Sequence, residues 1–456
     1  MQEKLATDPE VITSGETALL YDVATLINAV YQMTIEPTRE SNIPKRIVKK
    51  IRPLLKGQQR ITYKGDDAYI DMLMHVLKTL KLIKYTQAPF DNAKPYLSPG
   101  PRLEGWANKD MIEQTSQLLD EWQHNHNWAD NPRVSTDGGS WNYYGAYELT
   151  LRQLLLTHLR EYPEGSWHSV AALISEIWDA HPELATQQKM RPYSYGYYQM
   201  PKKQAKRDLF QEWVINAAPH FINMLYSSLN ELGIVDMGNA PLQEETKLVL
   251  KSCAFRITEL GAQVLAYKKT KAKSGKSEVA PAQKSLIIQP NYEILLLQPD
   301  LPTLYSILPF TQVKQIQMVS TLLLTQDALL RAIQQGLRIE TILAILRERS
   351  QKELPQNVIY TLQDWAKQYK HATVSQVALL ELPDEETTTR LSQHPTLSKM
   401  NARQLMPTTL AIPTDTNGNI NYQSIRQVLE KEHISVDFQI HSSDPMHKLR
   451  EYYYDD

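Results

Sequence analysis

IPKRIVKKIRPLLKGQQR, residues 43–60, combines an apolar stripe with a dense run of positive charge. The stripe consists of Ile43, Ile47, Ile51 and Leu55. A spacing of four residues places these side chains on one face of a helix, and lysine or arginine fills most other positions. Pro53 lacks an N–H group and crowds the preceding turn, so the helix should bend or end there. The pattern predicts a short or broken helix with one buried face and one basic face.

Two further helices and a hairpin flank this stretch. Residues 18–31 carry apolar side chains at spacings of three and four, which predicts an amphipathic helix. Asp66 and Asp67 precede AYIDMLMHVLKTLKLI, a third expected helix with acids in its first turn and lysines in its last. Residues 83–98, IKYTQAPFDNAKPYLS, predict two short strands joined by a turn. Three helices and a hairpin follow each other as in a winged helix, which we expect over residues 1–125.

A second unit of similar element order is predicted over residues 147–267. It is separated from the first by the irregular stretch 126–146, which is rich in Gly, Asn and Asp. Helices are expected from Tyr147 and after Ser166, the predicted cap, and a later helical run should stop at Gly233. The remaining residues of the unit predict a strand, a turn and a helix, so this is a second helical, winged-helix-like unit.

Residues 268–284, KKTKAKSGKSEVAPAQK, carry six lysines and one glutamate. Such a segment buries too little apolar surface to order itself, which predicts a lysine-rich linker. Gly275-Lys276-Ser277 matches the end of a phosphate-binding loop, but Thr270 stands where that loop requires its first glycine. Helix precedes the segment and Ala280-Pro281 follows it, whereas the loop needs a preceding strand and a following helix. We therefore expect no nucleotide site and no cofactor.

The composition becomes apolar again from Ser285. SLIIQPNYEILLL, residues 285–297, is strand-like, residues 321–350 hold two helical runs separated at Gly336, and residues 374–383 predict a strand. These elements predict a mixed α/β domain over residues 285–437, followed by a tail at 438–456. The whole chain is expected to be α+β and predominantly helical.

Several motifs of this last part carry a family resemblance. They are LIIQPNYEILLLQPDL (286–301), LTQDALLRAIQQG (324–336), IETILAILRERSQKELPQNVIYTLQDW (339–365) and VALLELPD (377–384). Together they resemble the N-terminal domain of XPB-type DNA helicases, as it occurs in bacterial helicase-associated proteins. PYLSPGPRLEGW (95–106), LRQLLLTHLREYPEGSW (151–167) and FRITELGAQVL (255–265) are similar to the winged-helix region of those proteins. The resemblance implies a DNA-associated protein of a bacterial repair, regulatory or defence assembly, with the motor expected in another chain.

Eight cations and no acid lie between Ser41 and Gly65, although the whole chain has a net charge of only −2. A basic surface on this protein must therefore be local. Cations on a winged-helix helix can displace counterions from DNA phosphates at or in the major groove, with the hairpin near Pro89–Pro95 as the wing. A solvated helix face is the alternative interpretation. The predicted DNA-binding set is Lys45, Arg46, Lys49, Lys50, Arg52, Lys56, Arg60 and Lys64.

A second set interleaves aromatic and positively charged side chains in an expected loop. Bases stack on aromatic rings while cations contact phosphates, which predicts a single-strand contact. Tyrosines that pack the loop onto its own domain are the alternative. The set is Arg191, Tyr193, Tyr195, Tyr197, Tyr198, Lys202 and Lys203.

Neither a metal site nor a catalytic residue is predicted. His124, His126 and Asp130 form a compact trio, but without helix or strand spacing we expect an exposed polar turn. Cys253, the single cysteine, lies in an apolar run and is expected in the core. No Ser/His/Asp or paired-carboxylate pattern stands out, so the chain is expected to be non-enzymatic.

The N-terminal residues, MQEKLATDPEVITSGE, are acidic and polar, and no run reaches the roughly 18 apolar residues of a membrane span. One cysteine fits a reducing compartment, so we expect a cytoplasmic protein without membrane contact. The expected partners are DNA, duplex or single-stranded, and a helicase or nuclease protein. A scaffold that recruits such an enzyme without contacting DNA is the alternative function, and an enzyme with a site assembled from distant residues is a third.

Overall fold

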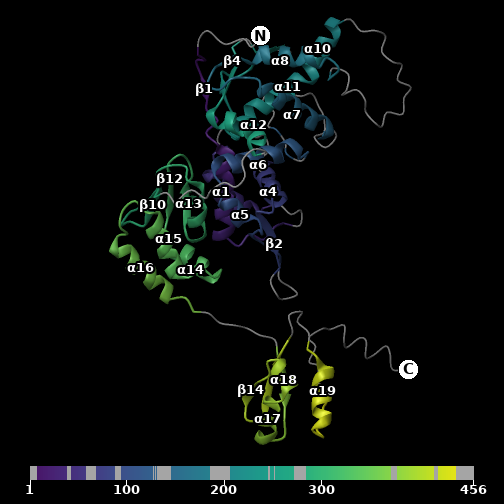
Figure 1. Cartoon of the computed structure of the whole chain (residues 1–456), viewed down its shortest axis with the longest axis vertical. Helices are drawn as coiled ribbons and strands as arrows, with labels where there is room; N and C mark the ends of the chain where they lie inside the picture. Colours follow the sequence, from purple (N-terminus) through teal and green to yellow (C-terminus); the bar gives the residue numbers. More distant parts are fainter. Residues whose placement is uncertain are drawn as a thin grey trace, which may run out of the picture. The chain divides into compact units, whose positions relative to one another are not determined.

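The computed structural model describes residues 8–38, 43–57, 68–87, 94–126, 128, 130, 145–184, 206–244, 247–250, 252–271, 284–370, 377–414 and 420–437. Its secondary structure is mixed α+β and predominantly helical, as predicted (Figure 1). The chain forms two compact units, Met1–Tyr369 and Lys370–Asp456. The division at Tyr369 lies inside the predicted 285–437 domain and differs from the three-domain organisation expected from the sequence.

The N-terminal third of unit 1 has the predicted order of helices and hairpin. Its elements are β1 (Ile12–Thr13), α1 (Ala18–Gln32), α2 (Lys45–Ile51), the 3₁₀ turn η1 (Arg52–Leu54), α4 (Ala68–Thr79), β2 (Ile83–Thr86), β3 (Tyr96–Pro99), α5 (Leu103–Ala107) and α6 (Met111–His124). Strands β2 and β3 pair antiparallel from Ile83 opposite Pro99 to Thr86 opposite Tyr96. The α-helix ends at Ile51, and Pro53 lies in the 3₁₀ turn that follows. All four residues of the predicted apolar stripe are buried.

Helix α1 is buried on every side rather than on one face. Every residue from Ala18 to Val30 is buried, including Asp22, Thr25 and Asn28. The helix was predicted correctly, but the prediction that only one of its faces is buried is wrong. Buried polar groups require hydrogen-bond partners, and these three side chains find theirs in the surrounding elements or in α1 itself. Helix α1 is consequently the centre of unit 1.

The middle third of unit 1 contains a second group of helices and an antiparallel sheet. Its elements are α7 (Gly145–Leu159), β4 (His168–Ser169), α8 (Val170–Ala180), α10 (Lys206–Asn216), α11 (Ala218–Met224), the π-helical turn η3 (Leu225–Leu229), β5 (Val235–Gly238), β6 (Leu242–Glu244), β7 (Lys247–Val249), β8 (Ala254–Ile257) and α12 (Glu259–Lys271). The sheet has the order β1-β5-β8-β4, so the N-terminal strand completes it. The cap of α8 is Ser169, which accepts from Ala172 N, and not the predicted Ser166. Cys253 is buried as expected.

The last third of unit 1 is a four-stranded antiparallel sheet with five helical segments. Its elements are β9 (Leu286–Ile288), β10 (Glu293–Leu296), α13 (Leu301–Ile307), the 3₁₀ turn η4 (Leu308–Phe310), β11 (Gln312–Gln315), β12 (Ser320–Leu323), α14 (Gln326–Gln334), α15 (Ile339–Arg349) and α16 (Gln356–Lys367). The strand order is β11-β12-β10-β9. The stretch 285–297 thus forms two strands, because the chain turns at Tyr292, whose φ is 69°. Gly336, at φ 100°, separates α14 from α15 as predicted.

Polar side chains of α1 bind this last third directly. Asn28 donates to the carbonyls of Leu308 (2.8 Å) and Thr311 (2.7 Å) and accepts from Val313 N (3.2 Å). Trp106 Nε1 of α5 donates to the Tyr305 hydroxyl at 2.9 Å. Residues 284–369 are therefore packed against the N-terminal helices within one unit, which differs from the independent domain expected after the linker.

Unit 2 is a small sheet with helices. Its elements are β13 (Val377–Glu381), α17 (Glu385–Ser392), α18 (Pro395–Lys399), β14 (Arg403–Met406), β15 (Thr409–Pro413) and α19 (Tyr422–Lys431), coloured yellow-green to yellow in Figure 1. The strand order is β13-β15-β14, and the unit has its own apolar core around Leu397, Leu410 and Ile412. Strand β13 confirms the strand predicted at residues 374–383. Among the described residues, no helix is long and apolar enough to cross a membrane.

Candidate nucleic-acid interface

Helix α2 presents four cations on its outer face. Ile47, Val48 and Ile51 are buried, whereas Lys45, Arg46, Lys49 and Lys50 are exposed. Positions three and four apart lie next to each other on a helix, so Lys45 neighbours Lys49, and Arg46 neighbours Lys49 and Lys50. None of the four forms an ion pair with any residue that the structure describes. This surface, which we call the α2 basic face, is available to a polyanion.

A buried carboxylate of α1 fixes the chain directly after α2 and η1. Asp22 accepts hydrogen bonds from the backbone N–H groups of Lys56 (2.6 Å) and Gly57 (2.7 Å) and from the Tyr69 hydroxyl (2.6 Å). A Cβ at residue 57 would collide with the Tyr69 side chain, so only glycine allows this approach. The Asp22 carboxylate thus joins α1 to α4 and to the chain that follows η1. These bonds fix the position of the α2 basic face relative to α1 and α4.

The remaining predicted DNA contacts are placed differently. The Lys56 side chain is only 14% exposed, pairs with Glu16 and lies with its Nζ 5.8 Å from the centre of the Tyr21 ring. Lys56 therefore packs against α1 and does not belong to the α2 basic face. Arg52 is half-buried in η1. Arg60 and Lys64 lie outside the described residues, as does the tip of the predicted wing at residues 88–93.

The hairpin β2–β3 carries further exposed cations, which are not in the predicted DNA-binding set. Lys81, Lys84 and Lys94 are exposed on or beside the two strands. Lys78 of α4 lies over the Tyr85 ring, with its Nζ 4.8 Å from the ring centre. The sequence contains a signal for these cations, because lysine recurs at every third position from 78 to 84. Only the pairing of β2 with β3 shows which of these lysines face solvent.

Burial raises the pKa of Asp22 to about 6, although the hydrogen bonds from Tyr69, Lys56 and Gly57 act in the opposite direction. A raised pKa means that the folded protein holds this proton more tightly than the unfolded chain does. Between about pH 4 and 6 the folded state therefore binds more protons, and the contribution of Asp22 to stability falls as pH rises. Above pH 6 that contribution becomes constant.

The Asp22→Asn variant should lose this pH dependence. We expect the difference in free energy of unfolding between wild type and variant to decrease from pH 4.5 to 6 and to stay flat from pH 6.5 to 7.5. Urea unfolding of both proteins at each pH measures the difference. Asp364→Asn on the exposed surface of α16 is the matched control and should give a constant offset. A pH-independent difference for Asp22→Asn would contradict a raised pKa.

The predicted His124, His126 and Asp130 trio is not one polar turn. His124 and His126 are exposed, but Asp130 is buried, and Arg152 binds it at 3.1 Å. The same guanidinium, which is fully buried, donates to the backbone carbonyls of Trp122, Asn125 and Trp128. No group of three or more metal-ligating side chains occurs among the described residues. Asp130 is thus a structural residue, and the expectation of an exposed turn was wrong for it.

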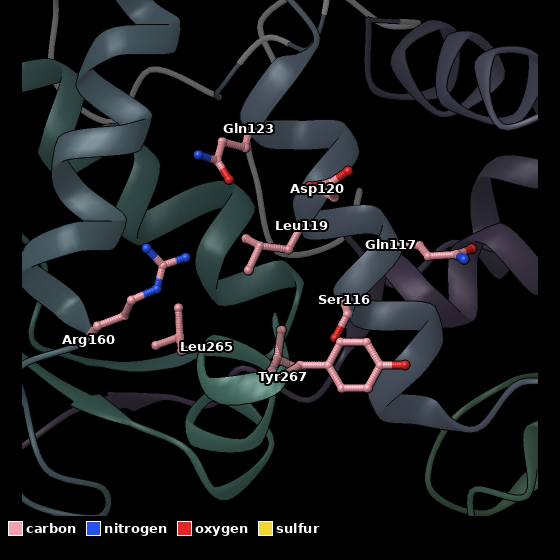
Figure 2. A pocket seen from close by; sticks show the side chains of 9 residues that line it. Ser116, Gln117, Leu119, Asp120, Gln123, Arg160, Leu265 and Tyr267 are labelled. Carbon is pink, nitrogen blue, oxygen red and sulfur yellow. The ribbon is translucent and has the colours of Figure 1, made fainter. Parts of the chain in front are cut away.

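A hollow of about 290 Å³ lies between α6, the end of α7 and α12. Figure 2 shows Leu119 and Leu265 on its floor, with the Arg160 side chain extending along one side. The buried Ser116 hydroxyl has no hydrogen-bond partner among the described residues. Tyr267 closes one end and donates from its hydroxyl to Glu113 at 3.0 Å. The hollow was not predicted, because α12 follows the other two walls by more than a hundred residues in the sequence.

The predicted single-strand set from Arg191 to Lys203 lies outside the described residues, as do residues 272–283 with Gly275-Lys276-Ser277 and the tail 438–456. Most of the predicted connector 126–146 is also outside them. These interpretations remain predictions from the sequence.

Residues 286–406 match a family model described as "Helicase conserved C-terminal domain". The match covers about a quarter of the chain, begins at the first residue of β9 and ends at the last residue of β14, so it includes elements of both units. No curated protein matches the chain. The match confirms a helicase-related segment where the sequence suggested one. Its description names a C-terminal domain, whereas the resemblance was to an XPB-type N-terminal domain.

Proposed function

We propose that this protein is a non-catalytic DNA-binding accessory protein that works with a helicase in a bacterial repair, regulatory or defence assembly. The observation that carries the proposal is the α2 basic face, which has four exposed cations without an ion-pair partner among the described residues. Asp22 fixes the chain that follows this helix and η1. The helicase-related match supports the same setting. We propose a cytoplasmic location and no cofactor, and we propose that the matched segment is an XPB N-terminal-like domain.

The proposed contact is with phosphates rather than with bases. Lysine and arginine side chains most often contact phosphate oxygens, and these contacts position a protein on DNA. Helix α2 carries the four exposed cations. Helix α4 follows residues 58–67, which lie outside the described part of the chain, and most of its described side chains are buried. Phosphate contacts carry no direct sequence information, so we expect binding with little sequence preference.

We propose that the middle third of unit 1 is a second winged-helix-like unit. Its described elements follow each other as α7, β4, α8, α10, α11, η3, β5, β6, β7, β8 and α12, and one sheet contains β5, β8 and β4 in that order. The helical segment before β5 spans Ala218–Leu229 and is buried except for the half-buried His220. A helix covered in this way presents no face to a DNA groove. We therefore propose that this second unit is a structural support and that the first unit contacts DNA.

A salt series with the whole chain tests the proposal. Fluorescence anisotropy with a labelled duplex should give binding at about 50 mM salt, and four phosphate contacts predict a log–log slope of about −3.6. Affinity should thus fall by about 150-fold between 50 and 200 mM salt. If no duplex, fork or single strand binds at 50 mM salt, the proposal is wrong.

Recruitment of a helicase or nuclease without DNA contact is the second candidate function. Unit 2 favours it, because Leu379 of β13 and Leu405 and Met406 of β14 are each at least 59% exposed. These residues lie on the two edge strands of the sheet β13-β15-β14, and exposed apolar side chains that gather on one element are typical of protein contacts. Retention of a helicase or nuclease after nuclease treatment, combined with no DNA binding in the salt series, would identify this function.

A further inference from the structure

The turn between β11 and β12 exposes two adjacent apolar side chains. Met318 is 57% exposed and Val319 is 49% exposed. The turn that carries them is fixed: Ile316 and Ser320 are buried, and the Ser320 hydroxyl donates to the Gln317 carbonyl (2.9 Å) and accepts from Gln317 N (3.1 Å). Two large apolar side chains are thus presented to solvent by a rigid hairpin tip.

This tip lies beside the segment that continues from α2. Strand β11 packs against α1 and against η1, which follows α2 without a break. The Tyr21 hydroxyl contacts the Met318 sulfur at 3.8 Å, and the Tyr21 ring also supports Lys56 directly after η1. The tip therefore lies close to the segment α2–η1 that carries the α2 basic face, and Tyr21 contacts both the tip and Lys56.

We propose that Met318 and Val319 contact unpaired bases at a DNA fork while the α2 basic face binds the adjacent phosphates. This inference rests on the proposed function and adds a preferred DNA structure to it. Apolar side chains inserted between bases are a recurrent way of unstacking them, and bases exposed at a fork offer apolar faces without the energetic cost of opening a duplex. The neighbouring charge favours a polyanion over an uncharged partner. The hairpin also belongs to the helicase-related match.

The double variant Met318→Ser/Val319→Ser separates the inference from the proposed function. Wild type should bind a forked DNA about tenfold more tightly than the same duplex without a fork, which corresponds to one stacked base. The variant should lose this preference and keep its duplex affinity within about twofold. A 2-aminopurine placed at the junction should change its fluorescence on binding wild type and not on binding the variant.

Val11→Ser/Ile12→Ser is the matched control, because it replaces another adjacent exposed apolar pair in unit 1. It should retain the fork preference. Circular dichroism melting should show that both double variants fold. Equal affinity of wild type for fork and duplex, or a fork preference that survives in Met318→Ser/Val319→Ser, overturns the inference while leaving duplex binding intact. Absence of all DNA binding overturns both proposals.

Discussion

The combined variant Lys45→Glu, Arg46→Glu, Lys49→Glu and Lys50→Glu should bind duplex DNA at least about 100-fold more weakly than wild type at about 100 mM salt. The four side chains are exposed and α2 buries its opposite face, so the changes alter charge without altering the apolar contacts of Ile47, Val48 and Ile51. Each lost phosphate contact removes one released counterion, and each new carboxylate repels the DNA. The salt slope should become nearly flat in anisotropy titrations.

A second variant with four charge reversals tests whether the loss of DNA binding is specific to α2 or follows from the change in net charge. Arg338, Arg347, Lys352 and Lys367 are exposed on α15, α16 and their flanks, and their reversal changes the net charge by the same amount. This control should retain most of the wild-type affinity. An equal loss in both variants would show that overall charge governs binding, and unchanged affinity in the α2 variant would exclude the α2 basic face as the DNA contact.

Arg152→Met should destabilise unit 1 by about 3–5 kcal/mol. The arginine is fully buried, and its removal leaves Asp130 as a buried charge without its cation and takes the guanidinium donors from the carbonyls of Trp122, Asn125 and Trp128. Burial and the nearby Asp130 raise the pKa of Glu148 and the Arg152 cation opposes this rise, so that the resulting pKa is about 7. The midpoint of urea unfolding, followed by tryptophan fluorescence, reports the loss, since Arg152 lies over the Trp122 ring.

Two further variants test whether the loss of stability comes from the buried pair of Arg152 and Asp130. Arg160→Met replaces an exposed arginine just after the same helix and should change stability by less than about 0.5 kcal/mol. Arg152→Met/Asp130→Asn removes the unpaired charge and should recover part of the loss. A single Arg152→Met variant that unfolds within about 1 kcal/mol of wild type would show that the buried pair is not needed for stability.

Local patterns predicted the features that depend on neighbouring residues. The fourfold spacing from Ile43 to Leu55 identified the buried stripe of α2, and the chemistry of Pro53 placed the end of that helix. Gly336 marked a helix break because its positive φ is costly for other residues. The cations of α2 were identified as a set, since helical periodicity alone separates them from the stripe.

Features made by distant segments were not predictable from those patterns. Asp22 and Asn28 are polar residues in an apolar helix, and nothing local shows that their partners are Lys56, Gly57 and Tyr69 in one case and residues 308–313 in the other. Arg152 has no distinguishing neighbour in the sequence, although it binds Asp130 and three backbone carbonyls in the core. Met318 and Val319 were unremarkable until the pairing of β11 with β12 placed them at a tip beside η1.

The central position of α1 also determines when the chain can fold during synthesis. The first strand pairs with β5, and Asn28 binds residues that follow it by 280 to 285 positions. Until that last third has left the ribosome, α1 lacks part of its cover and keeps apolar surface that should bind a chaperone. Unit 1 is therefore expected to fold late and cooperatively, and nascent chains halted before residue 308 should remain sensitive to protease within residues 18–32.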